Sequence, residues 1–518
     1  MSKSLFLFLC IASLLCFCDA YKVLVVFSLS GKSHSILGYG IVKHLLKTGH
    51  EVTYITAFPE ESSDPNLTQI DVSSNMVALP KSYKESLNLK TVLEGKAVPL
   101  DFDIIHNLMN AVEMNTYQIE NVSKLLNDPE QKFDVVIAEW MFTEICVGYA
   151  AIFNAPLIWF SSVQTHWIIT KLIDESLHPA YNAEAIAHSI PPFNFFQRAH
   201  NLWTQLQVFY HLTKGRQETL YANEIVPIIK KRGLVPPSFN DLLYNSSLVL
   251  SNTHVSYAAA TRLPQNYKPI GGFHIDEEVK PLPEDLKKVM DGASNGVIYF
   301  SMGSNLKSKE MPDMLKKELI KMFSDLKYTV LWKFEEEFFD LPENVHMVKW
   351  APQHSILAHP NCVLFITHGG LLSTIESIHF VVPIIAIPVF GDQFINVEWS
   401  VRKGFGKRVD LSYTLAEDLK AAIEEVFANP RYKEIAKETS LIYHDRPVSP
   451  GAELVHWVEH VVKTKGALHL RSPALFVPLY QKLYLDVLVV ILVFLIVLYK
   501  TARCLFFKEK ITNKKKNN

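Results

Sequence analysis

The sequence predicts an α/β fold made of two similar halves, each a parallel sheet with helices between its strands. Short apolar, β-branched runs alternate with amphipathic stretches of helical length along most of the chain. A proline-bearing segment, residues 264–283, separates one such series from another. A length of 518 residues is enough for two or three domains with large cores.

The first half opens with a strand–helix–strand unit. Residues 21–27 have the apolar pattern of a buried strand, and residues 28–35 form a predicted loop. An amphipathic helix is expected over 36–47, Gly49 ends it, and a strand follows at 51–56. This order implies a parallel sheet with a right-handed crossover.

The rest of the first half continues the pattern in part. A strand is expected at 133–138, a helix at 144–153 and a strand at 156–160. Residues 171–231 have helical character and give no strand pattern.

The second half repeats the β/α units after Pro283. Its strands are expected at 296–301, 330–333, 345–349, 363–367 and 384–389. The predicted domains are therefore 21–263 and 284–482, joined by the linker 264–283. Ligands of such sheets lie at the carboxyl ends of the strands, so the cleft between the halves is the expected site.

The N-terminus has the composition of a secretory signal peptide, residues 1–20. Lys3 is followed by an apolar run and by the small-residue cleavage site Cys18-Asp19-Ala20, so the mature chain is expected to begin at Tyr21. Glycosylation acceptors of the Asn-x-Ser/Thr type fit that route. They are Asn66, Asn121 and Asn245.

The C-terminal region predicts one membrane span at 483–499. Its uninterrupted apolar part would also suit a buried helix, but a basic tail follows at 500–518, as the positive-inside rule expects. We therefore expect a single-pass type I protein of the endoplasmic reticulum with luminal domains. Lys515 and Lys516 resemble a dilysine retrieval signal, although such a tail could equally be only a stop-transfer anchor.

Composition excludes some classes of function. The net charge is −2 and charged residues are 20% of the chain, which argues against a nucleic-acid binder. Cys146 and Cys362 are the cysteines left in the predicted luminal part, and both lie in apolar runs, so buried free thiols are expected. Residues 31–33, Gly-Lys-Ser, make no P-loop because Val26 stands where that motif needs glycine.

Residues 350–393 are the most informative stretch. A strand pattern at 363–367 is followed by two glycines and by a helix start at 373–376, and this arrangement presents free backbone N–H groups suited to a phosphate. Glu376 lies about one turn into that helix, where its carboxylate can accept hydrogen bonds from ribose hydroxyls. Trp350 offers a flat face for a base, although a Trp before Ala-Pro more often anchors a loop on a core.

The order of these residues resembles the signature of the UDP-glycosyltransferases, which include the glucuronosyltransferases. The resemblance covers about residues 21–499 and implies the two-domain GT-B fold. It implies that the Trp stacks on uracil, the His and Ser region holds the diphosphate, the Glu binds ribose and the Asp-Gln pair holds the sugar. The expected donor-binding residues are Ser304, Trp350, Gln353, His368, Gly370, Ser373, Glu376, Asp392 and Gln393.

Two details qualify the resemblance. Leu372 stands where many relatives have a polar Asn, which leaves more of the phosphate contact to Ser373. The run Gly-Gly-Leu-Leu-Ser at 369–373 is similar to the insect branch of the family.

The expected general base is His34, which follows the first strand and should face the cleft. The family pairs this His with an Asp at the end of a later strand. Here that position is Glu139, whose longer side chain leaves its fit open, while Asp134 lies at the other end of the strand. Asp101-Phe-Asp103 resembles a metal motif of a different transferase architecture but lies far from the donor residues in sequence.

We therefore expect an inverting, metal-independent hexosyl transfer from a UDP-sugar, with UDP-glucose preferred, to a hydroxyl of a small lipophilic acceptor. No cofactor is expected beyond this co-substrate. The alternatives are a UDP-glucuronate-using enzyme and a non-catalytic UDP-sugar or lipophile-binding protein. A Rossmann oxidoreductase would need Gly-x-Gly-x-x-Gly after the first strand, where residues 28–34 read Ser-Leu-Ser-Gly-Lys-Ser-His.

Overall fold

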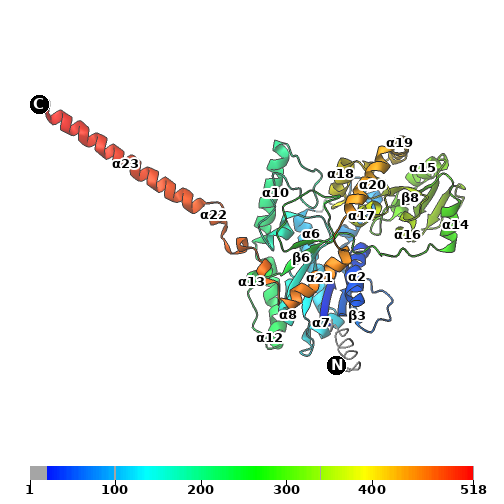
Figure 1. The fold of residues 1–518 in the computed structure, drawn as a ribbon, viewed down its shortest axis with the longest axis horizontal. Helices are drawn as coiled ribbons and strands as arrows, with labels where there is room; N and C mark the ends of the chain where they lie inside the picture. Colours follow the sequence, from blue (N-terminus) through cyan, green and yellow to red (C-terminus); the bar gives the residue numbers. More distant parts are fainter. Residues whose placement is uncertain (1–19, 98–100, 339, 517–518) are drawn as a thin grey trace, which may run out of the picture. The chain divides into compact units, whose positions relative to one another are not determined.

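A computed structural model describes residues 20–97, 101–338 and 340–516 (Figure 1). The predicted signal peptide, apart from Ala20, lies outside these described residues. The chain divides into a compact unit that ends at Leu470 and a second unit, Arg471–Asn518. The two units are described separately.

The larger unit contains two fully parallel sheets. The first has the strand order β3-β2-β1-β4-β5-β6-β7, and the second has the order β10-β9-β8-β11-β12-β13. The predicted α/β fold with two Rossmann-like sheets is confirmed. The strands of the first sheet are β1 (Lys22–Phe27), β2 (Glu51–Thr56), β3 (Leu67–Asp71), β4 (Val135–Trp140), β5 (Leu157–Ser161), β6 (Leu248–Ser251) and β7 (Tyr267–Pro269). Those of the second are β8 (Val297–Ser301), β9 (Thr329–Lys333), β10 (Val345–Val348), β11 (Cys362–Thr367), β12 (Ile384–Ala386) and β13 (Gly406–Arg408).

Helices cover both faces of each sheet, as crossover connections require. In the first half they are α2 (Lys32–Lys47), α3 (Asn75–Ala78), α4 (Lys81–Ser86), α5 (Leu89–Leu93), α6 (Phe102–Gln118), α7 (Glu120–Asn127), α8 (Val147–Phe153), α9 (Trp167–Lys171), α10 (Phe195–Leu212), α11 (Arg216–Leu220), a π-helical turn (Tyr221–Ile225), α12 (Val226–Lys231) and α13 (Phe239–Leu243). In the second they are α14 (Glu284–Gly292), a 3-10 turn (Ser308–Glu310), α15 (Asp313–Ser324), α16 (Gln353–Leu357), α17 (Leu371–His379), α18 (Gln393–Lys403), α19 (Leu415–Ala428), α20 (Arg431–His444), α21 (Pro450–Lys463) and a 3-10 turn (Leu468–Leu470).

One inner strand of each sheet, β1 in the first and β8 in the second, is buried on both faces. In β1, Val23 and Val25 belong to one apolar cluster while Leu24 and Val26 belong to another. β8 divides its side chains between two further clusters in the same way. A strand of this kind gives an unbroken apolar run in the sequence, which is why these strands were predictable.

Helix α21 crosses back from the second half to the first. Its Leu454 and Val458 pack in the same cluster as Val23 and Ile41 of the first sheet and its helix α2. Since β7 also belongs to the first sheet, that sheet extends into the segment predicted as a linker. The predicted domain boundaries stay a prediction.

The second unit contains one long helix, α23 (Leu485–Lys516), preceded by a 3-10 turn (Pro473–Phe476) and α22 (Leu479–Lys482). Within the described residues, Leu485–Phe507 is the one stretch of helix long and apolar enough to cross a membrane. At 1.5 Å per residue its 23 residues extend about 34 Å, which matches a hydrocarbon core of about 30 Å.

Candidate active site

The first part of the site lies where the strand order of the first sheet reverses. Strands β1 and β4 are parallel neighbours, with Val26 opposite Ala138. The chain leaves β1 toward β2 on one side and leaves β4 toward β5 on the other. The carboxyl ends of two strands that diverge in this way leave a crevice, the usual ligand position of such sheets.

His34 and Glu139 meet at this crevice. The Nδ1 atom of His34 lies 2.5 Å from Oε1 of Glu139, and the Glu139 side chain is 3% exposed. Glu139 follows directly after the Ala138 position of β4, so its carboxylate is fixed by the sheet. The bond to Nδ1 leaves Nε2 of His34 as the nitrogen available to an acceptor.

The local backbone makes room for the His34 ring. Helix α2 begins at Lys32, four residues earlier than predicted, so His34 lies in its first turn instead of in the preceding loop. A Cβ atom at Gly31 would lie 2.7 Å from Cδ2 of His34. The ring therefore lies over a residue without a side chain, and a Cβ atom there would displace it.

The electrostatic surroundings favour the imidazolium form of His34. Burial of the ring opposes protonation, but the Glu139 carboxylate, its hydrogen bond and the charge of Asp392 outweigh it. The pKa of His34 is therefore raised above its ordinary value of 6.5. A base whose protonated form is stabilised in this way is suited to accept a proton.

The second part of the site lies at the corresponding reversal in the second sheet, between β8 and β11. Gly303 and Ser304 form the turn after β8, and residues 368–370 form the turn after β11. A Cβ atom at Gly303 would lie 2.5 Å from Cε1 of His368, and one at Gly370 would lie 2.5 Å from Nε2 of the same ring. Gly303 also has a φ of +81°, so glycine is required there twice over.

His368 is a neutral ring at this turn. Burial and the nearby charge of Lys333 lower its pKa to about 4. At neutral pH it can donate or accept hydrogen bonds but carries no charge. Gly370 is the N-cap of α17 with no side-chain cap, so backbone N–H groups of the first turn are available to a ligand.

Lys333 supplies the charge that His368 lacks. It ends β9 with its ammonium 2.8 Å from the Gly303 carbonyl oxygen and 3.0 Å from a Glu335 oxygen. The same ammonium lies 5.8 Å from the ring centroid of Trp350. Trp350 is 60% exposed, which supports a stacking platform over an anchor packed on a core.

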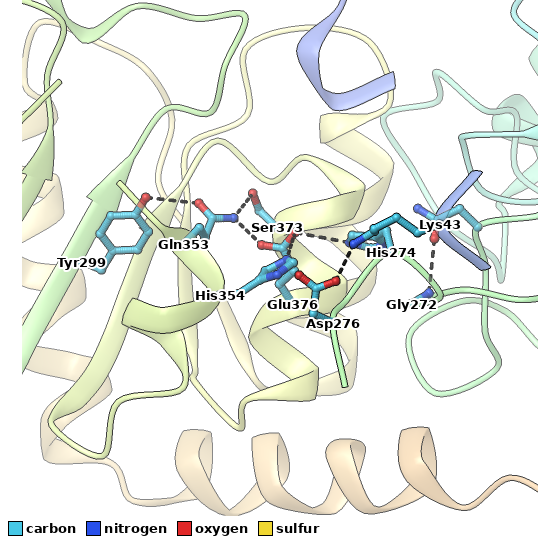
Figure 2. A network of polar contacts seen from close by, with 10 residues as sticks. Lys43, Gly272, His274, Asp276, Tyr299, Gln353, His354, Ser373 and Glu376 are labelled. Carbon is cyan, nitrogen blue, oxygen red and sulfur yellow. Dashed lines mark hydrogen bonds and ion pairs between the residues drawn. The ribbon is translucent and has the colours of Figure 1, made fainter. Parts of the chain in front are cut away.

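Gln353, Ser373 and Glu376 form one hydrogen-bonded group (Figure 2). The Gln353 amide nitrogen donates to Oγ of Ser373 at 3.1 Å and to Oε2 of Glu376 at 2.6 Å. Its carbonyl oxygen accepts from the Tyr299 hydroxyl at 3.2 Å. Helix α16 and helix α17 are thereby fixed to each other beneath the predicted donor.

Two histidines hold the other oxygen of Glu376 (Figure 2). Nε2 of His274 lies 3.2 Å from Oε1, and Nε2 of His354 lies 3.1 Å from it. Burial would raise the pKa of Glu376, but His354 and His274 hold it well below its ordinary value. Burial lowers the pKa of His274, whereas the Glu376 charge outweighs burial and raises that of His354.

This arrangement leaves one lone pair of Glu376 Oε2 for a ribose hydroxyl, since a carboxylate has about four acceptor positions. The ligand atoms of His274, His354 and Glu376 also lie within 4.8 Å of one another, a spacing that could hold a metal ion. Asp276, two residues after His274, pairs with Lys43 of α2, so the network reaches the helix that carries His34 (Figure 2).

Asp392 and Gln393 begin α18 opposite His34. Oδ2 of Asp392 accepts from Asn396 at 2.9 Å, and Asn396 in turn accepts from Gln164 of the first half at 2.7 Å. Burial raises the pKa of Asp392. Oε1 of Gln393 accepts from the backbone N–H groups of Val389 and Phe390, so this residue braces its own loop.

The predicted site residues thus fall into two groups that face each other. His34 and Glu139 are in hydrogen-bond contact, and the predicted donor residues lie around the carboxyl edge of the second sheet. Their roles stay proposals. Sequence reasoning missed Lys333, His274 and His354. Lys333 could have been identified from the sequence, because it is a basic residue at the carboxyl end of a predicted strand.

The Asp101-Phe-Asp103 motif has a structural use. Asp101 caps α6 by accepting from the Ile104 N–H at 2.9 Å, and Asp103 lies 2.9 Å from a ring nitrogen of His211. Cys146 and Cys362 are buried and free, as expected.

Comparison with known proteins supports the same kind of site as the geometry does. The family model described as UDP-glucoronosyl and UDP-glucosyl transferase matches residues 21–518. The chain belongs to this family. It is therefore a UDP-glycosyltransferase, an enzyme that uses a UDP-sugar donor.

Relatives span nearly the whole chain. UDP-glucosyltransferase 2 of Dactylopius coccus is 34% identical, covering 91% of this chain and 90% of its own length. UDP-glucuronosyltransferase 2B7 of Homo sapiens is 26% identical, covering 92% and 91%. Among solved structures, the calicheamicin glycosyltransferase CalG4 matches with a TM-score of 0.56 at 15% identity, covering 86% of this chain and 98% of that one, which supports the GT-B fold.

Proposed function

We propose that this UDP-glycosyltransferase transfers a hexosyl group from UDP-glucose to a hydroxyl of a small lipophilic acceptor, with inversion at the anomeric carbon. The observation that carries the proposal is the His34–Glu139 pair, whose charge interacts with Asp392 of the opposite half. A proton acceptor and a sugar-binding carboxylate face each other across the boundary between acceptor and donor halves.

The chemical step is a direct displacement. Nε2 of His34 takes the proton of the acceptor hydroxyl while that oxygen attacks the anomeric carbon from the face opposite UDP. The bond between the anomeric carbon and the β-phosphate oxygen breaks, and UDP leaves with the electron pair. Glu139 orients the ring through Nδ1 and stabilises the imidazolium that forms.

The donor residues act by position and charge. Trp350 stacks on uracil, and Gln353 and Glu376 receive the ribose. Ser304, Ser373 and the backbone of Gly370 bind the diphosphate, helped by His368. Asp392 and Gln393 hold the sugar hydroxyls.

Lys333 and the N-terminus of α17 provide positive potential for the leaving diphosphate. An ammonium on a largely buried side chain stabilises developing negative charge more strongly than one in water. We propose on this basis that transfer needs no metal ion.

The preference for UDP-glucose rests on the charges near Asp392. The charged group that acts on its carboxylate is the His34 ring, which glycosyl transfer itself requires. Arg408, which follows α18 in β13, is paired with Glu398 and Asp410. A glucuronate carboxylate next to buried Asp392 would meet like charge. Assays with both donors test this, and transfer from UDP-glucuronate alone would reverse the assignment.

The acceptor class is proposed from the relatives. They include ecdysteroid UDP-glucosyltransferases of two nuclear polyhedrosis viruses, 27% and 25% identical to this chain. A panel of phenols, steroids and plant alcohols with labelled UDP-glucose would define the acceptor. Transfer confined to peptides or polysaccharides would contradict a small lipophilic one.

His34→Ala separates this enzyme from a non-catalytic binding protein of the same fold. The variant should bind UDP with unchanged affinity in calorimetry and lose about 10²–10⁴-fold in kcat. Unchanged turnover would remove His34 from the mechanism. If the wild-type protein binds UDP but transfers no sugar to any acceptor tried, the non-catalytic binding protein would be favoured.

We further propose an endoplasmic-reticulum location with the two sheets in the lumen and residues 500–518 in the cytosol. Asn66, Asn121 and Asn245 are all exposed in the structure, as acceptors of glycans must be. Endoglycosidase digestion should increase the gel mobility of the protein from insect cells, and mobility unaffected by the enzyme would count against luminal domains.

A further inference from the structure

Three side chains with metal-binding atoms meet on the side of Glu376 that faces away from the proposed ribose contact (Figure 2). Nε2 of His274 lies 3.2 Å from Oε1 of Glu376, and Nε2 of His354 lies 3.1 Å from the same oxygen. The three ligand atoms all lie within 4.8 Å of one another. The proposed ribose contact uses the other oxygen, Oε2, so an ion and the ribose would bind to opposite sides of one carboxylate.

The spacing of these atoms fits zinc. Zinc is bound by imidazole nitrogen and carboxylate oxygen at about 2.0–2.2 Å, so two ligands of a tetrahedral ion lie about 3.4 Å apart. The two distances to the carboxylate oxygen, 3.1 and 3.2 Å, are close to that value. The imidazole nitrogens are at most 4.8 Å apart, so they would approach each other by at most about 1.4 Å. Two His, one Glu and a fourth position for water is a ligand set that zinc adopts in enzymes.

The burial of the ligands favours a four-coordinate ion. The side chains of His274 and Glu376 are 0% and 6% exposed, whereas that of His354 is 26% exposed. Such a site has little room for the six oxygen ligands, several of them water, that magnesium requires, and imidazole suits zinc better. His354 marks the side from which an ion can enter.

The fold already holds the three ligands together. His274 follows β7, His354 lies in α16 and Glu376 lies in α17. The Gln353 amide donates to Oε2 of Glu376 at 2.6 Å, which fixes the direction of Oε1. A site that is assembled before the ion arrives loses less conformational freedom on binding.

The surroundings of His274 indicate an exchangeable ion. Its Nδ1 atom is buried and has no hydrogen-bond partner among the residues that the structure describes. A histidine in a permanent zinc site usually donates its second ring N–H to a carboxylate or a carbonyl oxygen, and this bond increases the affinity for the metal. Without that bond, a weaker and reversible site is expected.

We propose that His274, His354 and Glu376 form a reversible zinc site that inhibits the enzyme. An ion on Oε1 draws electron density from the carboxylate, so Oε2 becomes a weaker acceptor for a ribose hydroxyl. Zinc and the UDP-sugar then each lower the affinity for the other by the same factor. This coupling rests on the proposed role of Glu376 as a ribose ligand, whereas the binding of zinc does not.

Titration of the full-length protein in detergent with cobalt(II) tests the site itself. Four-coordinate cobalt absorbs visible light strongly, and zinc should displace it. The absorption band should appear in the wild type and be lost in His354→Asn and in Glu376→Gln, each of which removes one ligand. His460→Asn is the matched control and should keep the band, because Nε2 of His460 lies 3.1 Å from that of His469 at the surface and could bind metal there. A band that survives both ligand substitutions, or no band in the wild type, would overturn the proposal.

Calorimetric titration with UDP, with and without zinc, tests the inhibition. Zinc should lower the UDP affinity of the wild type and of His460→Asn about 5- to 150-fold, the usual range of coupling between two sites. Zinc also binds free diphosphate, and His354→Asn measures that effect alone. If cobalt binds as expected but zinc lowers the UDP affinity of the wild type no more than that of His354→Asn, the inhibition is wrong and Glu376 does not bind the ribose. The transfer activity of the metal-free wild type is measured separately and decides the proposed function.

Discussion

In the proposed mechanism, the two halves use the same place in the same kind of sheet for different chemistry. At the β1/β4 reversal the acting groups are side chains, the imidazole of His34 and the carboxylate of Glu139. At the β8/β11 reversal they include backbone, because Gly303 and Gly370 leave no side chain between the turn and the His368 ring. Moving a proton needs a titratable group, whereas binding a diphosphate needs donors fixed before the ligand arrives. The fold supplies the position and the loop sequence supplies the chemistry.

Glu139→Gln should have the largest effect and should be confined to the first reversal. The amide cannot stabilise the imidazolium, so kcat should fall about 10²–10³-fold with the UDP affinity unchanged. Glu139 raises the pKa of His34. In the proposed mechanism the neutral ring is the base, so the acid limb of the pH–rate profile should move to lower pH in the variant.

Glu139→Asp is the matched control for charge, and it restores the residue that the family signature has at this position. It should keep the acid limb near its wild-type pH and lose less in kcat. A Gln variant with wild-type kcat and an unmoved acid limb would show that Glu139 does not act on His34.

A pair of glycine substitutions should separate the two reversals. Gly31→Ala places Cβ 2.7 Å from the His34 ring and should lower kcat while UDP binding stays constant. Gly303→Ala forces a left-handed residue against His368 and should weaken UDP binding about tenfold to a hundredfold. Calorimetric UDP titrations and initial rates measure both. The control is Gly292→Ala, whose Cβ would have no neighbour within 4 Å. If both substitutions reduced UDP affinity equally, the division of labour would be incorrect.

Lys333→Met tests the charge at the second reversal. Loss of the ammonium should raise the KM for the UDP-sugar about tenfold, with a smaller change in kcat. Lys349→Met is the control, because Lys349 is a neighbour of Trp350 in sequence but is exposed and paired with Glu337. Equal effects of the two substitutions would mean that Lys333 contributes only to the general potential.

His354→Asn should have a modest effect on stability with a defined pH dependence. The pKa of His354 is raised in the folded state. The stabilisation that its protonated form gives to the folded protein is therefore complete below pH 6.5 and is lost as the pH rises through the raised pKa. The wild type should therefore lose thermal stability as the pH rises from 6.5 through that raised value, and the variant should lose less. Differential scanning calorimetry should show a difference of about 2 °C in Tm. Identical Tm–pH curves would mean that the Glu376 pair adds no net stability.

Removal of metal should have the smallest effect. Dialysis against EDTA should leave kcat and the UDP affinity unchanged if Lys333 and α17 stabilise the diphosphate. A loss of activity restored by a divalent cation would contradict this. If zinc at low concentration instead competed with UDP-glucose, the His274–His354–Glu376 cluster would be its site, since it contains the proposed ribose ligand Glu376.

The sequence predicted most of the strands that are buried on both faces, but it missed β6 (Leu248–Ser251), whose four residues are all buried. β1, β8 and β11 are unbroken apolar runs and were expected within one residue of their bounds. The edge strands β3, β7 and β13 were also missed. An edge strand keeps polar residues exposed, as Leu67–Asp71 does, or is only three residues long, as Tyr267–Pro269 and Gly406–Arg408 are.

The candidate site was predictable where its residues follow strands and less so elsewhere. His34 and Glu139 meet because neighbouring parallel strands bring their ends together. The contact of His274 with Glu376 joins residues 102 positions apart. It was not predictable because His274 lies in the segment 264–283, which gave no pattern beyond its prolines. The early start of α2 also followed from packing, since Gly31 accommodates the His34 ring in the first helical turn.

The return of α21 to the first sheet has a mechanical consequence. The polypeptide passes between the halves twice, once before β8 and once between α20 and α21. A single connection would allow the halves to swivel in any direction, whereas two connections define an axis. We therefore expect any movement of the halves that admits a donor to be a hinge rotation about that axis, along which the His34 imidazole would approach Asp392 by one path.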